Sequence, residues 1–255
     1  MSYEGYNENY EKKGFTFPYT YELKKGNKKF ICLGSSHSND PESPEFKLFK
    51  KEFIKLKPQV IFVEGNHEKV DWLDKCKSEE YAIKIDEMAF LSYIAQKKKI
   101  PVLSWEPGEV AEIKILDKKF SRKNIFAHYM LRLIGQYIQI GKPKDYFEFA
   151  IKEFEKLTKW RGFDYSFENL KKIHKELFGF NLTLSKSKVQ LYSLPPFPIK
   201  NDSVLNKIAA ESSKLRDKHA VKVILKSFKK YDRVLAIMGG SHAIMQEPVY
   251  REYFD

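Results

Sequence analysis

The sequence predicts an α/β fold: a parallel sheet forms the core, helices flank it, and a helical insertion lies between the third and last core strands. Three observations lead to this expectation. Short, uninterrupted apolar runs recur along the chain, as in strands covered on both faces. Segments whose apolar residues are spaced three and four apart separate these runs. From residue 107 to about residue 184, only the helical spacing continues. Alternating strands and helices of this kind are typical of α/β proteins.

The predicted core strands are four short apolar runs, at residues 30–33, 60–63, 100–105 and 234–238. Pro101 has no backbone N–H, so the third strand is expected to start there or to lie at an edge of the sheet. Residues 19–23 add a peripheral strand.

Helices are predicted between these strands. Apolar residues recur at helical spacing over 44–56 and over 78–96, and the second of these begins with Ser78, a favourable N-cap, followed by two acidic residues. A long helix over 203–230 leads into the last strand.

The insertion spans residues 107–200 and is helical for most of its length. It serves either as extra cover for the core or as a cap over a cleft, since mobile caps over active sites are common. Residues 185–202 contain a proline-rich stretch that predicts a stiff linker. We therefore expect residues 1–255 to form a single α/β domain that carries this insertion.

The composition argues against several classes of function and location. The 255 residues include 46 basic and 34 acidic side chains, which give a net charge of +12, but 40 of the basic residues are lysines scattered along the chain. Sequence-specific recognition of nucleic acid favours arginine, so no specific nucleic-acid partner is expected. The sequence contains no transmembrane segment and no secretory signal, and its two cysteines cannot form a disulfide framework. We expect a cytoplasmic protein; the oligomeric state stays open.

Imidazole or carboxylate side chains occur where each of the four core strands ends. With the neighbouring tryptophan, these residues are His37, Glu64, His67, Trp105, Glu106 and His242. The first and last strands are followed by the same Gly-x-x-His spacing, at 34–37 and 239–242. Glycines there allow a sharp turn or a close approach of backbone to a ligand. Because ligands in open α/β sheets bind beyond the carboxyl ends of the strands, the sequence predicts a polar site at this edge.

Four short motifs follow one another in a fixed order: Gly-x-x-His at 34–37, Val63-Glu64-Gly65, Leu215-Arg216-Asp217 and Gly-x-x-His at 239–242. This ordered set, over residues 28–254, resembles the superfamily that joins TraB/PrgY pheromone-shutdown proteins, Tiki proteases, ChaN-like proteins and erythromycin esterases. The resemblance implies an EreA/ChaN-like α/β core with helical insertions and a site at the strand ends. Members of this superfamily include metal-dependent peptidases, esterases without metal, and iron- or haem-linked proteins.

The resemblance leaves two chemistries open. Similarity to the Tiki proteases implies that His37, Glu64 and His242 hold one divalent transition metal, Mn, Co or Zn, with a water as nucleophile. Similarity to the esterases implies that His37 is a general base that works with Glu64 and without metal. On the sequence alone the metal hypothesis is preferred, because two imidazoles flanking a carboxylate are more typical of a ligand set than of a proton relay.

Further residues complete the candidate site. Arg216 is expected to clamp an anion or to stabilise an oxyanion, unless it forms only a surface ion pair with Asp217 or Glu211. Glu106 is expected to act as an acid, a base or an outer partner of an imidazole. Candidates for substrate contact or for support of the site are His67, Trp105, Asp217 and Ser241.

We therefore expect a hydrolase, peptidase- or esterase-like and metal-dependent, that acts on a small molecule or a peptide. The alternative on the same fold is a non-catalytic protein that binds metal, haem or a peptide, or that has a regulatory role. The segment from Gly239 to Ala243 nearly matches a serine-nucleophile elbow, but no histidine follows His242, as that mechanism requires. The chain has no glycine-rich phosphate-binding loop, so no nucleotide cofactor is expected.

Overall fold

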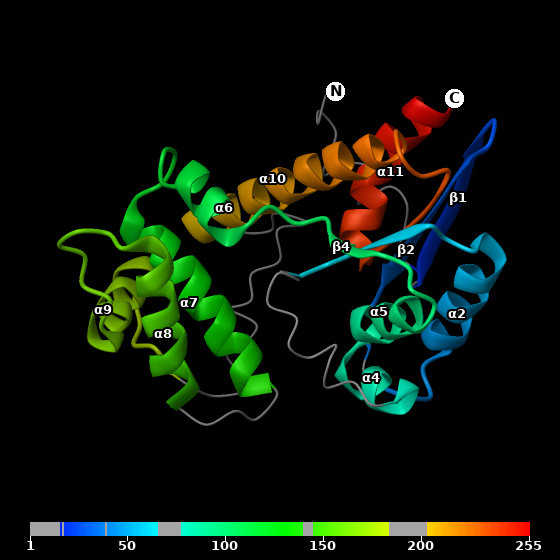
Figure 1. The fold of residues 1–255 in the computed structure, drawn as a ribbon. Coiled ribbons are helices and arrows are strands. Elements are labelled where there is room, and N and C mark those ends of the chain that lie inside the picture. The colour runs from blue at the N-terminus through cyan, green and yellow to red at the C-terminus, as the bar shows by residue number, and fades with distance from the viewer. Residues whose placement is uncertain (1–15, 17, 39, 66–77, 140–144, 184–202) are drawn as a thin grey trace. The chain divides into compact units, whose positions relative to one another are not determined.

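The computed structural model describes residues 16, 18–38, 40–65, 78–139, 145–183 and 203–255 (Figure 1). The fold is α/β, as predicted, with a five-stranded and mostly parallel sheet. The chain divides into two compact units. The first unit comprises Met1–Pro107 with Arg216–Asp255, and the second comprises Gly108–Leu215.

The sheet belongs to the first unit and has the strand order β1-β2-β5-β3-β4. Its strands are β1 (Tyr19–Lys25), β2 (Lys28–Ser35), β3 (Val60–Val63), β4 (Val102–Ser104) and β5 (Arg233–Gly239). Strand β1 is antiparallel to β2, and the other neighbours pair in parallel. The last strand in the sequence therefore lies in the centre of the sheet, between β2 and β3.

This strand order brings distant parts of the sequence to one edge. Ser35 at the end of β2 is the register partner of Gly239 at the end of β5. Strand β3 pairs with the other side of β5 and ends at Val63, directly before Glu64. The two Gly-x-x-His motifs and Glu64 consequently leave three adjacent parallel strands at the same edge, where ligands bind in such sheets.

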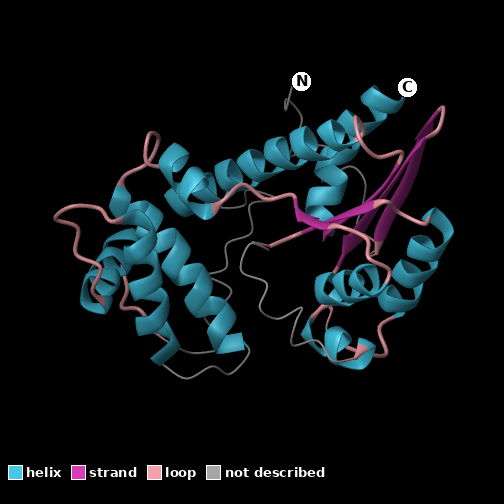
Figure 2. Ribbon diagram, in the orientation of Figure 1, coloured by secondary structure: helices cyan, strands magenta, loops and turns pink. Residues whose placement is uncertain are grey.

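Helices cover both faces of the sheet (Figure 2). Side chains alternate between the two faces along each strand. In β2, Ile31 and Leu33 pack in one apolar cluster with α2 (Pro44–Leu56) and α5 (Glu87–Lys97). Phe30 and Cys32 face the other side, where α11 (Gly240–Phe254) and the last turns of α10 (Val204–Ser227) pack. Burial on both faces explains why these strands are uninterrupted apolar runs in the sequence.

The prediction of one helix over 78–96 is wrong in one respect, because this segment forms two helices. Helix α4 (Glu79–Ile85) ends at Asp86, whose backbone is extended, and α5 begins at the next residue. The carboxylate of Asp86 accepts a hydrogen bond from the N–H of Ala89 at 2.7 Å, which makes it the N-cap of α5. Apolar periodicity continues through the break, so the spacing alone does not reveal it.

The third core strand is shorter than predicted. Strand β4 covers only Val102–Ser104 and lies at the edge of the sheet, directly after Pro101. Because proline cannot donate to a neighbouring strand, an edge position is the one that the sequence favours.

The second unit is helical, as predicted for the insertion, and consists of α6 (Glu109–Leu116), α7 (Arg122–Gln139), α8 (Asp145–Thr158), α9 (Phe167–Phe178) and the first part of α10. It extends past residue 200, through Leu215. Aromatic side chains such as Phe126, Phe154 and Tyr165 form much of its core. The proline-rich linker lies outside the described residues. Among the described residues, no helix has both the length and the apolar character needed to span a bilayer.

Candidate functional site

His37 is placed at the sheet edge by a short loop after β2. Its backbone lies in the left-handed region, with φ of 59°, which is uncommon for a residue other than glycine. Its side chain is 57% exposed, and Nδ1 lies 3.2 Å from Oε1 of Glu87. A strained backbone at an exposed imidazole is a feature that clusters at functional sites.

Glu87 is the partner of His37 that the sequence did not reveal. It is fully buried at the first position of α5, and its Oε1 also accepts a hydrogen bond from the hydroxyl of Ser35. The pairing with Glu87 raises the pKa of His37, burial lowers it, and the nearby Glu64 raises it again, with a net rise to about 9. The sequence does place Asp86, a residue type favoured at N-caps, directly before Glu87, but the apolar spacing of this segment predicts one unbroken helix.

Glu64 leaves β3 and faces the start of α11. Its Oε2 accepts the N–H of Gly239 at 2.8 Å, and its Oε1 accepts from Nη2 of Arg216 at 2.7 Å. Burial would raise the pKa of Glu64, but the neighbouring Arg216, the imidazoles beside it and the Gly239 N–H lower it to about 2. Glu64 is thus an ionised carboxylate at neutral pH.

The glycines of the two Gly-x-x-His motifs serve close packing. A methyl group on Gly239 would lie 2.6 Å from Nε2 of His37 and 3.6 Å from Oε2 of Glu64. A methyl group on Gly34 would lie 2.8 Å from the Cβ of Ala243 in α11. Neither glycine has a positive φ, so the sharp turn expected from them is not the reason for glycine at these positions. At Gly239 the imidazole of His37 occupies the space that a side chain would take.

Arg216 is the centre of a buried network, and it is not the surface ion pair with Asp217 or Glu211 considered from the sequence. Its guanidinium, 12% exposed, contacts the carboxylates of both Glu64 and Glu106. Burial opposes the charge, but these two carboxylates raise the pKa of Arg216 above its ordinary value. Trp105 lies under it, with the guanidinium carbon 5.4 Å from the indole ring centre.

His242 lies in the first turn of α11 and is held from both ring nitrogens. Nδ1 lies 2.7 Å from the carboxylate of Asp217, which can only accept, so Nδ1 carries the proton. Nε2 then accepts from Nη1 of Arg216 at 3.2 Å. Asp217 is fully buried and also accepts from Gln246 at 2.6 Å, and Gln246 in turn accepts from the hydroxyl of Tyr250.

Three other predicted residues have different positions. Trp105 is fully buried: its Nε1 donates to the carbonyl of Ile237, and its ring packs on that of His242. It therefore supports the site from below and has no surface that a substrate could reach in this structure. Ser241 is half-buried in the first turn of α11. His67 lies outside the described residues.

The chain matches no family model and no curated protein with which it was compared. The resemblance to the EreA/ChaN-like superfamily therefore stays a prediction that rests on the ordered motifs. Function has to be argued from the geometry of the site.

His37, Glu64 and His242 do not fit a shared metal in this arrangement. Nε2 of His242 points at the cationic Arg216, and both oxygens of Glu64 accept from N–H donors. A metal ligand needs a lone pair directed at the ion, and Arg216 already supplies the positive charge that these groups face. Within the described part of the chain, no group of three or more His, Cys, Asp or Glu side chains is arranged to hold a metal ion.

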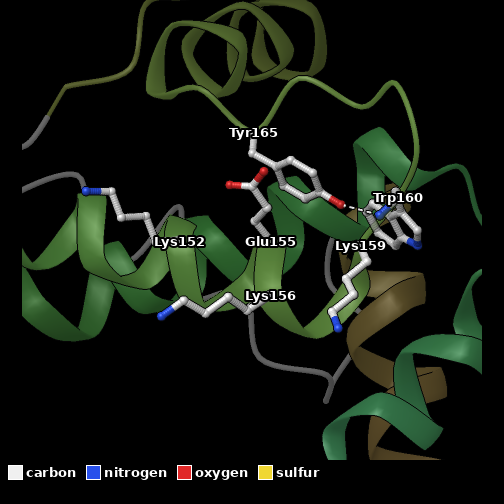
Figure 3. Close-up of a pocket in the computed structure, with 6 residues that line it drawn as sticks. All are labelled: Lys152, Glu155, Lys156, Lys159, Trp160 and Tyr165. Atoms are coloured by element: carbon white, nitrogen blue, oxygen red, sulfur yellow. Dashed lines mark hydrogen bonds between the residues drawn. The ribbon is translucent and has the colours of Figure 1, made fainter.

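A pocket in the second unit has a different chemistry (Figure 3). Its volume is about 480 Å³, and it is lined by Lys152, Glu155, Lys156, Lys159, Trp160 and Tyr165. The hydroxyl of Tyr165 accepts from the N–H of Trp160 at 2.7 Å, so the two are held by each other. None of the six lining residues is a histidine, and the lining contains no imidazole–carboxylate pair. The candidate for acid–base chemistry is therefore the sheet edge of the first unit.

Proposed function

We propose that this protein is a hydrolase of ester or peptide bonds whose site is the sheet edge formed by His37, Glu64, Glu106, Arg216 and His242. One observation carries the proposal: an exposed imidazole, held at Nδ1 by a buried carboxylate, lies beside a buried guanidinium network. Imidazoles oriented in this way by a carboxylate are the usual general bases of hydrolases.

His37 supplies the proton transfer. Its Nε2 faces Gly239 and Glu64, and Nδ1 is taken by Glu87. In its neutral form, Nε2 takes a proton from a water molecule while the water oxygen bonds to the carbonyl carbon of the substrate. The C–O or C–N bond to the leaving group then breaks, and the leaving group takes the proton from Nε2. The imidazole returns to its starting state, so the protons balance.

Arg216 supplies the positive charge. A guanidinium has five N–H donors, and within the described part of the chain the contacts with Glu64, Glu106 and His242 use three of them. The remaining donors support a role in stabilising the oxyanion of the tetrahedral intermediate. Glu106 and Glu64 fix the plane of the guanidinium, which keeps its donors pre-oriented, and His242 holds it from the third side.

The arrangement favours the esterase-like chemistry over the metal-dependent one. A built-in cation between the two carboxylates and His242 supplies the positive charge that a metal would supply, and it occupies the same donor atoms. A resident metal would require Arg216 to leave this network.

The proposal is tested with a panel of ester and peptide substrates at pH 10, where most of the His37 side chains are neutral. Wild type is expected to hydrolyse at least one class, and His37→Ala is expected to lose this activity by about 1,000-fold or more. His219→Ala is the matched control, because His219, also on α10, makes none of the contacts described above and should keep full activity. Hydrolysis that His37→Ala retains, or a wild type that binds ligands without turnover, would contradict the proposal.

Chelation separates the two chemistries. Exhaustive treatment with a chelator is expected to leave hydrolysis unchanged, and added Mn, Co or Zn is expected to have no effect. If chelation abolishes the activity and one metal restores it, the metal-dependent hypothesis is correct and Arg216 does not act as the oxyanion stabiliser.

A further inference from the structure

The loop that carries His37 is fixed by two buried carboxylates from different helices. Glu87 of α5 contacts the ring of His37 at Nδ1 and the hydroxyl of Ser35. Glu45, in the first turn of α2, accepts the N–H of Ser36 with both carboxylate oxygens, at 3.1 and 3.3 Å. Both glutamates are almost completely buried, at 0% and 3% exposure, which is rare for this residue type unless it has a specific partner.

The two contacts have different consequences for His37. The Glu45 contact holds the backbone before His37 and does not touch the ring. The Glu87 contact reaches the ring itself, and a carboxylate accepts only, so it selects the tautomer that carries its proton on Nδ1. The bare nitrogen of the neutral ring is then Nε2, which lies against Gly239 at the edge where Glu64 and Arg216 meet.

The position of Glu87 depends on the break between α4 and α5. Asp86 caps α5, so Glu87 is the first residue of a new helix, where the N-terminal dipole stabilises a buried carboxylate. In an uninterrupted helix over 78–96, residue 87 would have no such end position. The break in the helix and the contact with His37 are therefore parts of one arrangement.

We infer that Glu87 is a positioning residue for His37: it holds Nδ1–H and thereby presents Nε2 as the reactive nitrogen, while Glu45 fixes the loop. The catalytic consequence of this inference rests on the proposed function, but the contact and the tautomer do not. Glu87→Ala should free the ring to turn and to adopt the other tautomer. Glu87→Gln keeps the size of the side chain and an oxygen that can accept from Nδ1–H.

The first readout needs no substrate. Full-length protein with ¹⁵N-labelled histidine is studied by NMR at pH 10, where His37 is neutral. Wild type is expected to show the proton of His37 on Nδ1, and Glu87→Ala is expected to move it to Nε2 in a large share of molecules. Glu87→Gln should lie between the two. A wild-type spectrum with the proton on Nε2, or a Glu87→Ala spectrum identical to that of wild type, would overturn the inference.

The second readout is activity. Glu87→Ala is expected to lower kcat about 100-fold with little change in KM, and Glu87→Gln is expected to recover part of this loss. Ser92→Ala is the control, because Ser92 is equally buried on the same helix and its hydroxyl has no hydrogen-bond partner among the described residues. A Ser92→Ala variant that loses as much activity as Glu87→Ala would reduce Glu87 to a structural role. If no substrate is hydrolysed, the proposed function fails, and the NMR result still decides the tautomer.

Discussion

The two Gly-x-x-His motifs have the same spacing and leave neighbouring strands, yet they place their histidines in opposite environments. His37 lies in a loop with its ring 57% exposed and one ring nitrogen held by Glu87. His242 lies in a helix with its ring 10% exposed, and Asp217 and Arg216 hold both nitrogens. Strand and motif bring each imidazole to the sheet edge, but the neighbouring elements decide whether a nitrogen is available for chemistry.

The difference assigns unlike tasks to the pair. His242 has both ring nitrogens hydrogen-bonded inside the protein, so its role is structural: it connects Asp217 to Arg216. An imidazole with a largely exposed side chain and one nitrogen not held by Glu87 can exchange protons with water or substrate. Two histidines in equivalent environments would support a shared metal. Here His242 has both nitrogens hydrogen-bonded and His37 has only one nitrogen held, which supports a single general base beside a fixed cation.

The largest expected loss of stability comes from breaking the network that holds His242 but not His37. Arg216→Met removes the cation that lies between the largely buried carboxylates of Glu64 and Glu106. The free energy of unfolding, measured by denaturant titration, should fall by about 3–5 kcal/mol. Arg122→Met is the control, since the pair of Arg122 with Asp117 is more exposed and should contribute at most about 1 kcal/mol. A loss below about 1 kcal/mol at Arg216 would mean that water already satisfies both carboxylates.

The next effect compares the two histidines directly. His242→Ala leaves buried Asp217 without one donor and opens space beside Trp105, so the free energy of unfolding should fall by about 2–3 kcal/mol. His37→Asn should cost about 1 kcal/mol or less, because the ring is exposed and asparagine tolerates the left-handed backbone. Among the folded, purified variants, activity should show the reverse order, with the deeper loss at His37. Equal destabilisation by the two variants would remove the distinction between a structural and an available histidine.

The last expected effect needs no substitution and appears in wild type as a function of pH. His37 has a pKa raised to about 9, so the ring is protonated below that pH and works as a base only above it. The ratio kcat/KM should rise about tenfold per pH unit toward pH 9 and then level off. The free energy of unfolding should change in the opposite direction and fall as the pH rises. The pair of protonated His37 with Glu87 stabilises the fold below the ordinary imidazole pKa, and this stabilisation is lost as the pH rises through 9.

Two other residues sharpen the interpretation of the pH profile, Glu64 and Glu87. Glu64 has a pKa lowered to about 2, so it stays ionised throughout and contributes no step to the profile. Glu87→Gln should shift the midpoint down toward the ordinary imidazole value near about 6.5. A wild-type midpoint already at that ordinary value would show that Glu87 does not pair with His37 in solution.

The fold class can be predicted from the sequence because the spacing of apolar residues is a local pattern. The runs at 30–33, 60–63 and 234–238 become β2, β3 and β5, and the helical spacing over 44–56 becomes α2 with the same bounds. Local patterns also locate His37, Glu64, Glu106 and His242 at strand ends, where the structure places them. The break at Asp86 follows a local rule too, since aspartate is a good N-cap, but the apolar spacing across it conceals the change of helix.

Only the tertiary structure decides which of these groups meet. The central place of β5 depends on non-local pairing between strands about 200 residues apart, which no short pattern encodes. The role of Glu87 depends on a helix start that packs against the end of β2, where Ser35 lies 52 positions earlier in the chain. The contrast between His37 and His242 arises in the same way, because their nitrogens are satisfied by Glu87, Asp217 and Arg216 from other elements. The sequence by itself determined the strands, the helices and the set of chemical groups at one edge; burial and long-range contacts, which fix pKa values and tautomers, determined what each group can do.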